Sequence, residues 1–241
     1  MSLARSNPKR ALAMADSWGK QGGGLGARHC AALALFESGQ QADAAARFEA
    51  IEHDMGKERP GLRAELLGQA GQAWAAAGQP EKAVAAQSRA LELKAEDADL
   101  WLDRGLSYAM LQDWAHAIAD FDRALALRAN DVEILVLRAA ARRSAGDPAR
   151  ARADAELALK IAPDNTEALL ERGFARLAQG DAAGARADFT RVVSLVPPDS
   201  QAGRRAAAGL QGESPASAPP ARPERPSSEK TPSEKTPGEK P

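Results

Sequence analysis

Three arginines and three aspartates recur at fixed spacing and are the side chains most able to form an electrostatic site. Each aspartate follows its arginine by 16 residues, and both series repeat every 34 residues. They lie among apolar residues, where an unpaired charge is costly. Either they bind a charged ligand or they bind each other. The six residues are Arg104, Asp120, Arg138, Asp154, Arg172 and Asp188.

The histidines, the cysteine and a Gly-rich run do not combine into a metal, catalytic or phosphate-binding site. His29 precedes Cys30, but adjacent helical residues point in different directions and no carboxylate follows at helical spacing, so we expect packing and no metal site. His53 and His116 each lack a supporting partner for acid–base catalysis. The run GGGLG, residues 22–26, lacks the strand and the Lys-Ser or Lys-Thr of a phosphate loop and predicts a flexible link. We therefore predict no catalytic residues, no metal and no cofactor, and a protein that is not an enzyme.

Composition narrows the class of protein further. The 241 residues include 32 basic and 33 acidic side chains, so no net field attracts nucleic acid or an acidic membrane. The single cysteine excludes an internal disulfide framework. No apolar run approaches the roughly 18 residues of a membrane span, so we expect no membrane insertion. The expected location is the cytoplasm, or the periplasm or outside if a leader was removed before Met1.

Small residues and turn signals repeat with the same period as the charges. Glycines at 71, 105 and 173 and alanines at 83, 117, 151 and 185 are each in register at multiples of 34 residues. Segments such as SAGDPARA, residues 144–151, place Gly at a helix end, then an N-cap Asp, then Pro at the first helical position. With aromatic residues at only 4%, this pattern predicts an all-α fold, an α-solenoid of helix–turn–helix repeats.

The same positions resemble the tetratricopeptide repeat family. Its pattern of aromatic and small residues is met most fully in the repeat that begins at Ala98, which departs only with Ala129 in place of proline; the matching residues are Trp101, Gly105, Tyr108, Ala117, Phe121 and Ala124. The resemblance implies a right-handed superhelix in which the first helix of each repeat lines a concave groove. It also implies a protein that binds other proteins.

The repeats divide the chain into eight segments. We predict an N-terminal orphan helix and Gly-rich link at 1–24, a degenerate repeat with an insertion at 25–63, and four regular repeats at 64–97, 98–131, 132–165 and 166–199. A capping helix is expected at 200–211. The remainder, 212–241, is rich in Pro, Ser, Glu and Lys and is predicted to be disordered.

The period also predicts partners for the six charges. If each repeat is an antiparallel hairpin, its arginine and aspartate lie opposite each other, which gives the pairs Arg104 with Asp120, Arg138 with Asp154 and Arg172 with Asp188. Where the arginine position holds Ala70, the aspartate position holds Ala86. We therefore interpret the charges as structural ion pairs that fix hairpin register. The first repeat departs, with Ala31 opposite Arg47.

Function is expected in the groove that the family resemblance implies. The groove positions are mostly apolar, and the Lys, Asn and Arg set with which one subgroup of the family grips carboxylates is absent. We predict an adaptor or scaffold that docks a hydrophobic or amphipathic partner segment. The alternatives are a homo-oligomer formed through the groove or the array ends, and a groove occupied by the chain's own helix at 8–18. The predicted groove residues are Leu102, Leu106, Met110, Val136, Ala140, Arg143, Leu170, Phe174 and Leu177.

Overall fold

The computed structural model describes residues 2–212, and in this range the chain is helical, with no strand. This confirms the predicted all-α solenoid. The predicted disordered segment lies outside the described residues apart from Gly212. The helices are α1 (Ser2–Ser6), α2 (Pro8–Lys20), α3 (Gly24–Glu37), α4 (Gln41–Asp54), α5 (Pro60–Ala76), α6 (Pro80–Leu93), α7 (Ala98–Met110), α8 (Trp114–Leu127), α9 (Val132–Ser144), α10 (Pro148–Ile161), α11 (Thr166–Ala178), α12 (Ala182–Leu195) and α13 (Gln201–Leu210).

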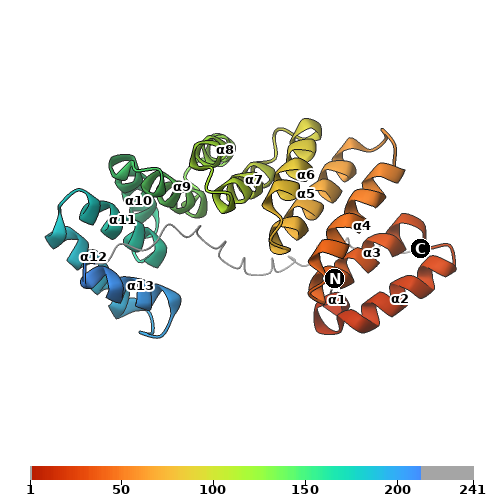
Figure 1. Ribbon diagram of the computed structural model, residues 1–241, viewed down its shortest axis with the longest axis horizontal. Helices are drawn as coiled ribbons and strands as arrows, with labels where there is room; N and C mark the ends of the chain where they lie inside the picture. The colour runs from red at the N-terminus through yellow and green to blue at the C-terminus, as the bar shows by residue number, and fades with distance from the viewer. Residues whose placement is uncertain (1, 213–241) are drawn as a thin grey trace, which may run out of the picture.

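Consecutive helices pack as hairpins that stack into an arch (Figure 1). From α3 to α12 each odd-numbered helix is the first of a hairpin and each even-numbered helix is the second. The first helices also contact one another, α5 with α7, α9 with α11, and α11 with α13. They therefore form the inner face of the arch, while the second helices form the outer face.

Local sequence sets the hairpin turns. The second helices α8, α10 and α12 begin after Asp113, Asp147 and Asp181, and each of these carboxylates accepts a hydrogen bond from a backbone N–H of the first helical turn. Before two of these caps the chain passes through the left-handed region at Gly146 and Gly180. This conformation is readily adopted by glycine, so the Gly-Asp pair stops one helix and starts the next.

Inside the three hairpins from α7 to α12, the sizes of two facing residues compensate each other. A Cβ added to Gly105 would lie 2.6 Å from the ring of Phe121, which is fully buried on the facing helix. A Cβ added to Gly173 would lie equally close to the ring of Phe189. In the hairpin between them, the equivalent positions hold Ala139 and Ala155, which are both fully buried. Glycine thus faces phenylalanine, whereas alanine faces alanine.

We expect Gly105→Ala to lower the free energy of unfolding by about 1–3 kcal/mol, because the added methyl group overlaps a ring that has no room to move. Chemical denaturation followed by circular dichroism measures the change. Gly61→Ala is the matched control, since a Cβ there meets nothing within 4 Å. The control should be neutral or slightly stabilising, and an equal loss in both variants would contradict the packing argument.

The N-terminal elements differ from expectation in two ways. The predicted flexible link is wrong for Gly24–Gly26, because α3 begins at Gly24. A Cβ at Gly23 or Gly26 would lie 2.7 or 2.8 Å from the ring of Trp18, so these glycines allow α2 and α3 to approach closely. The N-terminal helix does not fill a groove at α7 to α11, because α2 packs on α3 in the way that a second helix packs on the next hairpin.

The insertion before the second hairpin also forms helix. Helix α5 begins at Pro60, four residues earlier than the repeat pattern suggests, and this extension carries Arg63. Arg63 Nη2 lies 2.6 Å from an oxygen of Glu52, a buried carboxylate on α4 that also binds Arg89 of α6. The extra turn therefore supplies one of two cations that neutralise a buried charge between hairpins.

Candidate partner-binding face

The structure brings each recurring arginine to an aspartate of its own hairpin. Arg104 Nε and Nη2 each lie 2.8 Å from a carboxylate oxygen of Asp120, in a two-pronged geometry. Arg138 Nη2 lies 2.7 Å from Asp154, and Arg172 Nη2 lies 2.6 Å from Asp188. The hydrogen bond to Asp120 raises the pKa of Arg104. The three aspartates are buried between helices, so they are badly placed to meet a ligand; their exposed fractions are Asp120 4%, Asp154 4% and Asp188 3%.

Two further arginines share these aspartates, and sequence reasoning missed them. Arg142 Nη1 lies 2.7 Å from Asp154 Oδ2, and Arg176 Nη1 lies 2.8 Å from Asp188 Oδ2. Both occupy the repeat position that holds Tyr108 in the preceding hairpin. Their 34-residue separation in the sequence was a usable signal for a further repeated charge. Two buried aspartates therefore each bind two guanidinium groups.

The expectation of an open apolar groove is wrong for five of its residues. Leu102, Val136, Ala140, Leu170 and Phe174 are all buried. Adjacent first helices lie close enough that these side chains fill the space between hairpins, where Leu102 belongs to one apolar cluster and Val136, Leu170 and Phe174 to another. They stabilise the stack and present no surface to a partner.

Arg143, another predicted groove residue, is also held within the array. Its Nε lies 2.7 Å from Glu171 Oε2, and its guanidinium lies 5.6 Å from the Phe174 ring centroid. Glu171 is 2% exposed and binds Arg205 Nη2 of α13 at 2.8 Å as well. This network joins α9, α11 and the terminal helix. Sequence reasoning missed Glu171 and Arg205, which lie outside the 16-residue spacing of the hairpin pairs.

Three predicted groove residues keep accessible surface. Met110 is 39% exposed, and Leu106 and Leu177 are partly exposed. Leu106 and Met110 lie one turn apart on α7. Gln72 of α5 is exposed, and its amide donates a hydrogen bond to Asp103 Oδ2 of the same α7 at 2.6 Å. We call Gln72, Leu106 and Met110 the inner patch. It combines an amide with two apolar side chains on the first-helix face.

The isolated histidines and the cysteine form no reactive set. His29 Nε2 lies 2.7 Å from Gln69 Oε1, its ring contacts Phe48, and the neighbouring Cys30 is exposed. His116 Nδ1 lies 2.7 Å from Asp113 Oδ2 at the start of α8. Within residues 2–212, no three His, Cys, Asp or Glu side chains are grouped so that they could hold a metal. Nor does any helix in that range have the length and apolar character to cross a membrane.

Comparison with known proteins places one hairpin in a sequence family. The family model for the tetratricopeptide repeat matches residues 98–131, which contain α7 and α8. No curated protein matches the chain in sequence.

Solved structures share the arrangement of the whole array. A tetratricopeptide repeat protein from Parabacteroides merdae superposes with a TM-score of 0.64 at 15% identity, over 85% of this chain and 73% of that one. MamA from Desulfovibrio magneticus RS-1 superposes with a TM-score of 0.65 at 18% identity, over 71% of this chain and 94% of that one. YrrB is described as a TPR protein with an unusual peptide-binding site. It superposes with a TM-score of 0.54 at 21% identity, over 68% of this chain and 81% of that one. At these identities the likeness shows the fold.

Proposed function

Since this chain is a tetratricopeptide repeat protein, we propose that it is a non-enzymatic adaptor or scaffold whose inner face binds a segment of a partner protein. The fold is generally one of protein interaction, and the similar YrrB is described as having a peptide-binding site. The recurring arginines and aspartates support this assignment indirectly, because they form ion pairs between helices and so do not form a site for a charged ligand. We assign binding to the first-helix face.

The inner patch is the observation that carries the proposal. Its side chains come from two adjacent hairpins and stay accessible where most neighbouring inner residues are packed. An amide can hydrogen bond to the backbone of an extended peptide, while Leu106 and the flexible Met110 can contact an apolar side chain. This chemistry fits an extended amphipathic segment with a single apolar anchor better than a long hydrophobic helix.

We expect Leu106→Glu combined with Met110→Glu to abolish partner capture while the array stays folded, because two charges would be desolvated under the bound segment. Affinity capture with mass spectrometry, followed by titration of the purified partner, measures the loss. The matched control is Leu127→Glu with Ile161→Glu, whose parent side chains on second helices are 38% and 46% exposed. Retained capture by the inner variant, or equal loss in both, would contradict the proposal.

A specific surface favours self-assembly as a second candidate function. On α2, Met14 is 54% exposed and Trp18 is 48% exposed, and both border an apolar recess of about 290 Å³ beside α3. A second copy could cover this end of the array. If so, the mass measured by light scattering rises with concentration, and Met14→Lys with Trp18→Lys prevents the rise. A wild-type chain that stays monomeric at every concentration would exclude it.

A further inference from the structure

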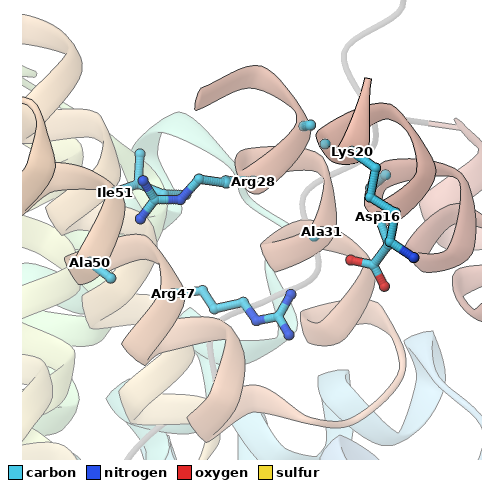
Figure 2. A pocket seen from close by; sticks show the side chains of 10 residues that line it. Asp16, Lys20, Arg28, Ala31, Arg47, Ala50 and Ile51 are labelled. Carbon is cyan, nitrogen blue, oxygen red and sulfur yellow. The ribbon is translucent and has the colours of Figure 1, made fainter. Parts of the chain in front are cut away.

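A charged pocket lies between α2, α3 and α4, at the opposite end of the array from α13 (Figures 1 and 2). Its volume is about 510 Å³, within the range of small-ligand sites. Small, buried alanines line part of it, and Ala31 is one of them. Asp16 and Lys20 reach it from α2, and Arg47 reaches it from α4.

The repeat register explains why this pocket is open. Ala31 stands where other hairpins carry the arginine of the recurring ion pair, and Arg47 stands where they carry the aspartate. In the α9–α10 hairpin, this space is filled by Arg138, which lies 2.7 Å from Asp154 on one side and 2.6 Å from Asp122 of the preceding helix on the other. Without that long side chain, the space beside α3 is left for a ligand.

The pocket walls carry charges without internal partners. Asp16 occupies on α2 the position that Asp122 occupies on α8, and its carboxylate and the guanidinium of Arg47 face each other across the pocket (Figure 2). Within residues 2–212, the side chains of Asp16, Lys20 and Arg47 form no ion pair with another side chain. Arg28, by contrast, is held by Asp54 at 2.6 Å. Among the described residues, the pocket thus offers two cations and one carboxylate that have no ion-pair partner.

This arrangement selects a dipolar ligand. A carboxylate can bind Arg47, while a cationic group beside it can bind Asp16 (Figure 2). A simple dianion would be repelled by Asp16. The last residues of this chain supply adjacent groups of the required signs three times, in Glu229-Lys230, Glu234-Lys235 and Glu239-Lys240.

We propose that these Glu-Lys units of the chain's own C-terminal segment bind in the pocket formed by Asp16, Lys20 and Arg47.

The C-terminal segment is long enough to reach this pocket from the end of α13. Five steps between first helices separate α13 from α3, which is about 40–50 Å at the 8–10 Å spacing of packed helices. Six of the 21 residues between Gly212 and Glu234 are prolines. A Pro-rich segment of that length spans about 65 Å at about 3.1 Å per residue. Binding would bring the two ends of the chain together, and it does not depend on the inner patch.

The test uses the full chain with a nitroxide attached to Cys30, its single cysteine, which is exposed on α3 and directly precedes Ala31 of the pocket lining. The measurement is the broadening of backbone amide signals from residues 228–240 at low protein concentration, relative to the same sample with the nitroxide reduced. We expect broadening in the wild type and its loss in Arg47→Ala. Changing the three glutamates, at 229, 234 and 239, to glutamine should abolish it in the same way.

Arg186→Ala is the matched control, because Arg186 is also an exposed arginine on a second helix without a side-chain partner within residues 2–212. Broadening should persist in this variant. The proposal is overturned if the wild type shows no broadening, or if Arg47→Ala and Arg186→Ala behave alike. A mixed sample distinguishes binding within one chain from binding between two copies. It contains isotope-labelled Cys30→Ser chains, whose signals are observed, and unlabelled chains that carry the nitroxide. Broadening found only in that mixture would overturn the intramolecular assignment in favour of a second copy.

Discussion

Replacing Asp154 with alanine is expected to lower the free energy of unfolding by about 3–5 kcal/mol, because it removes the buried carboxylate that two half-buried guanidinium groups share. Arg138 and Arg142 both bind this carboxylate, and all three side chains lie between α9 and α10. Only Arg138 has an alternative carboxylate at bonding distance, Asp122 at 2.6 Å, since Arg142 approaches Asp122 no closer than 3.6 Å. Asp120→Ala should cost a similar amount, because among the described residues it likewise leaves one arginine, Arg104, without a carboxylate at bonding distance.

A double-mutant cycle with Arg142→Ala measures this coupling by chemical denaturation. The interaction energy should lie in the range of about 0.5–3 kcal/mol that contacting charges show. The exposed pair of Arg152 and Glu156 is the control, and Arg152→Ala should change stability by less than about 0.5 kcal/mol. Strictly additive losses for Asp154 and Arg142 would contradict the view that these charges stabilise the hairpin as a unit.

Replacing Glu171 with alanine is expected to cost a similar amount, about 3–5 kcal/mol, because it leaves Arg143 and Arg205 without their shared buried partner. The effect should also be local. Glu171 joins α9 and α11 to the terminal helix, and Arg205 is the side chain through which α13 takes part. Loss of this bridge should allow α13 to open before the rest of the array does.

Amide hydrogen exchange resolves this local effect. Protection in α13 should fall in Glu171→Ala by more than protection in α7 and α8 does. Glu167→Ala is the control, since Glu167 binds the same Arg205 but its side chain is 43% exposed, and its loss leaves Arg205 bound to the buried Glu171. Uniform loss of protection along the array would contradict a bridge specific to the terminal helix.

The hairpin architecture could be predicted from the sequence because the features that build it are local and periodic. Gly-Asp turns, capping residues and the 34-residue register specify where helices end and which residues of a hairpin face each other. Arg104 and Asp120 were paired from this spacing alone. Arg142 was not paired because it lies 12 residues from Asp154 and not 16, although a guanidinium can reach the same buried carboxylate from there.

The candidate site could be predicted only in part, because exposure depends on how closely neighbouring hairpins stack. The repeat pattern predicts which residues point toward the inner face, and it assigns both Leu102 and Met110 to that face without distinguishing their exposure. The side chain of the next first helix then decides that Leu102 is fully buried whereas Met110 is 39% exposed. The pocket at Arg47 was visible in the sequence as a broken ion pair, but its size depends on the packing of α2 against α3.

Partner binding through the inner face is tested most directly by site-specific photocrosslinking. A photoreactive amino acid placed at Met110 or at Leu127 compares two side chains of nearly equal exposure, 39% and 38%, on first and second helices respectively. We expect the partner to crosslink to position 110 and not to position 127, and we expect unlabelled partner to reduce the yield of the crosslinked product. Crosslinking at position 127 alone, or equal crosslinking at both positions, would contradict partner binding through the inner face.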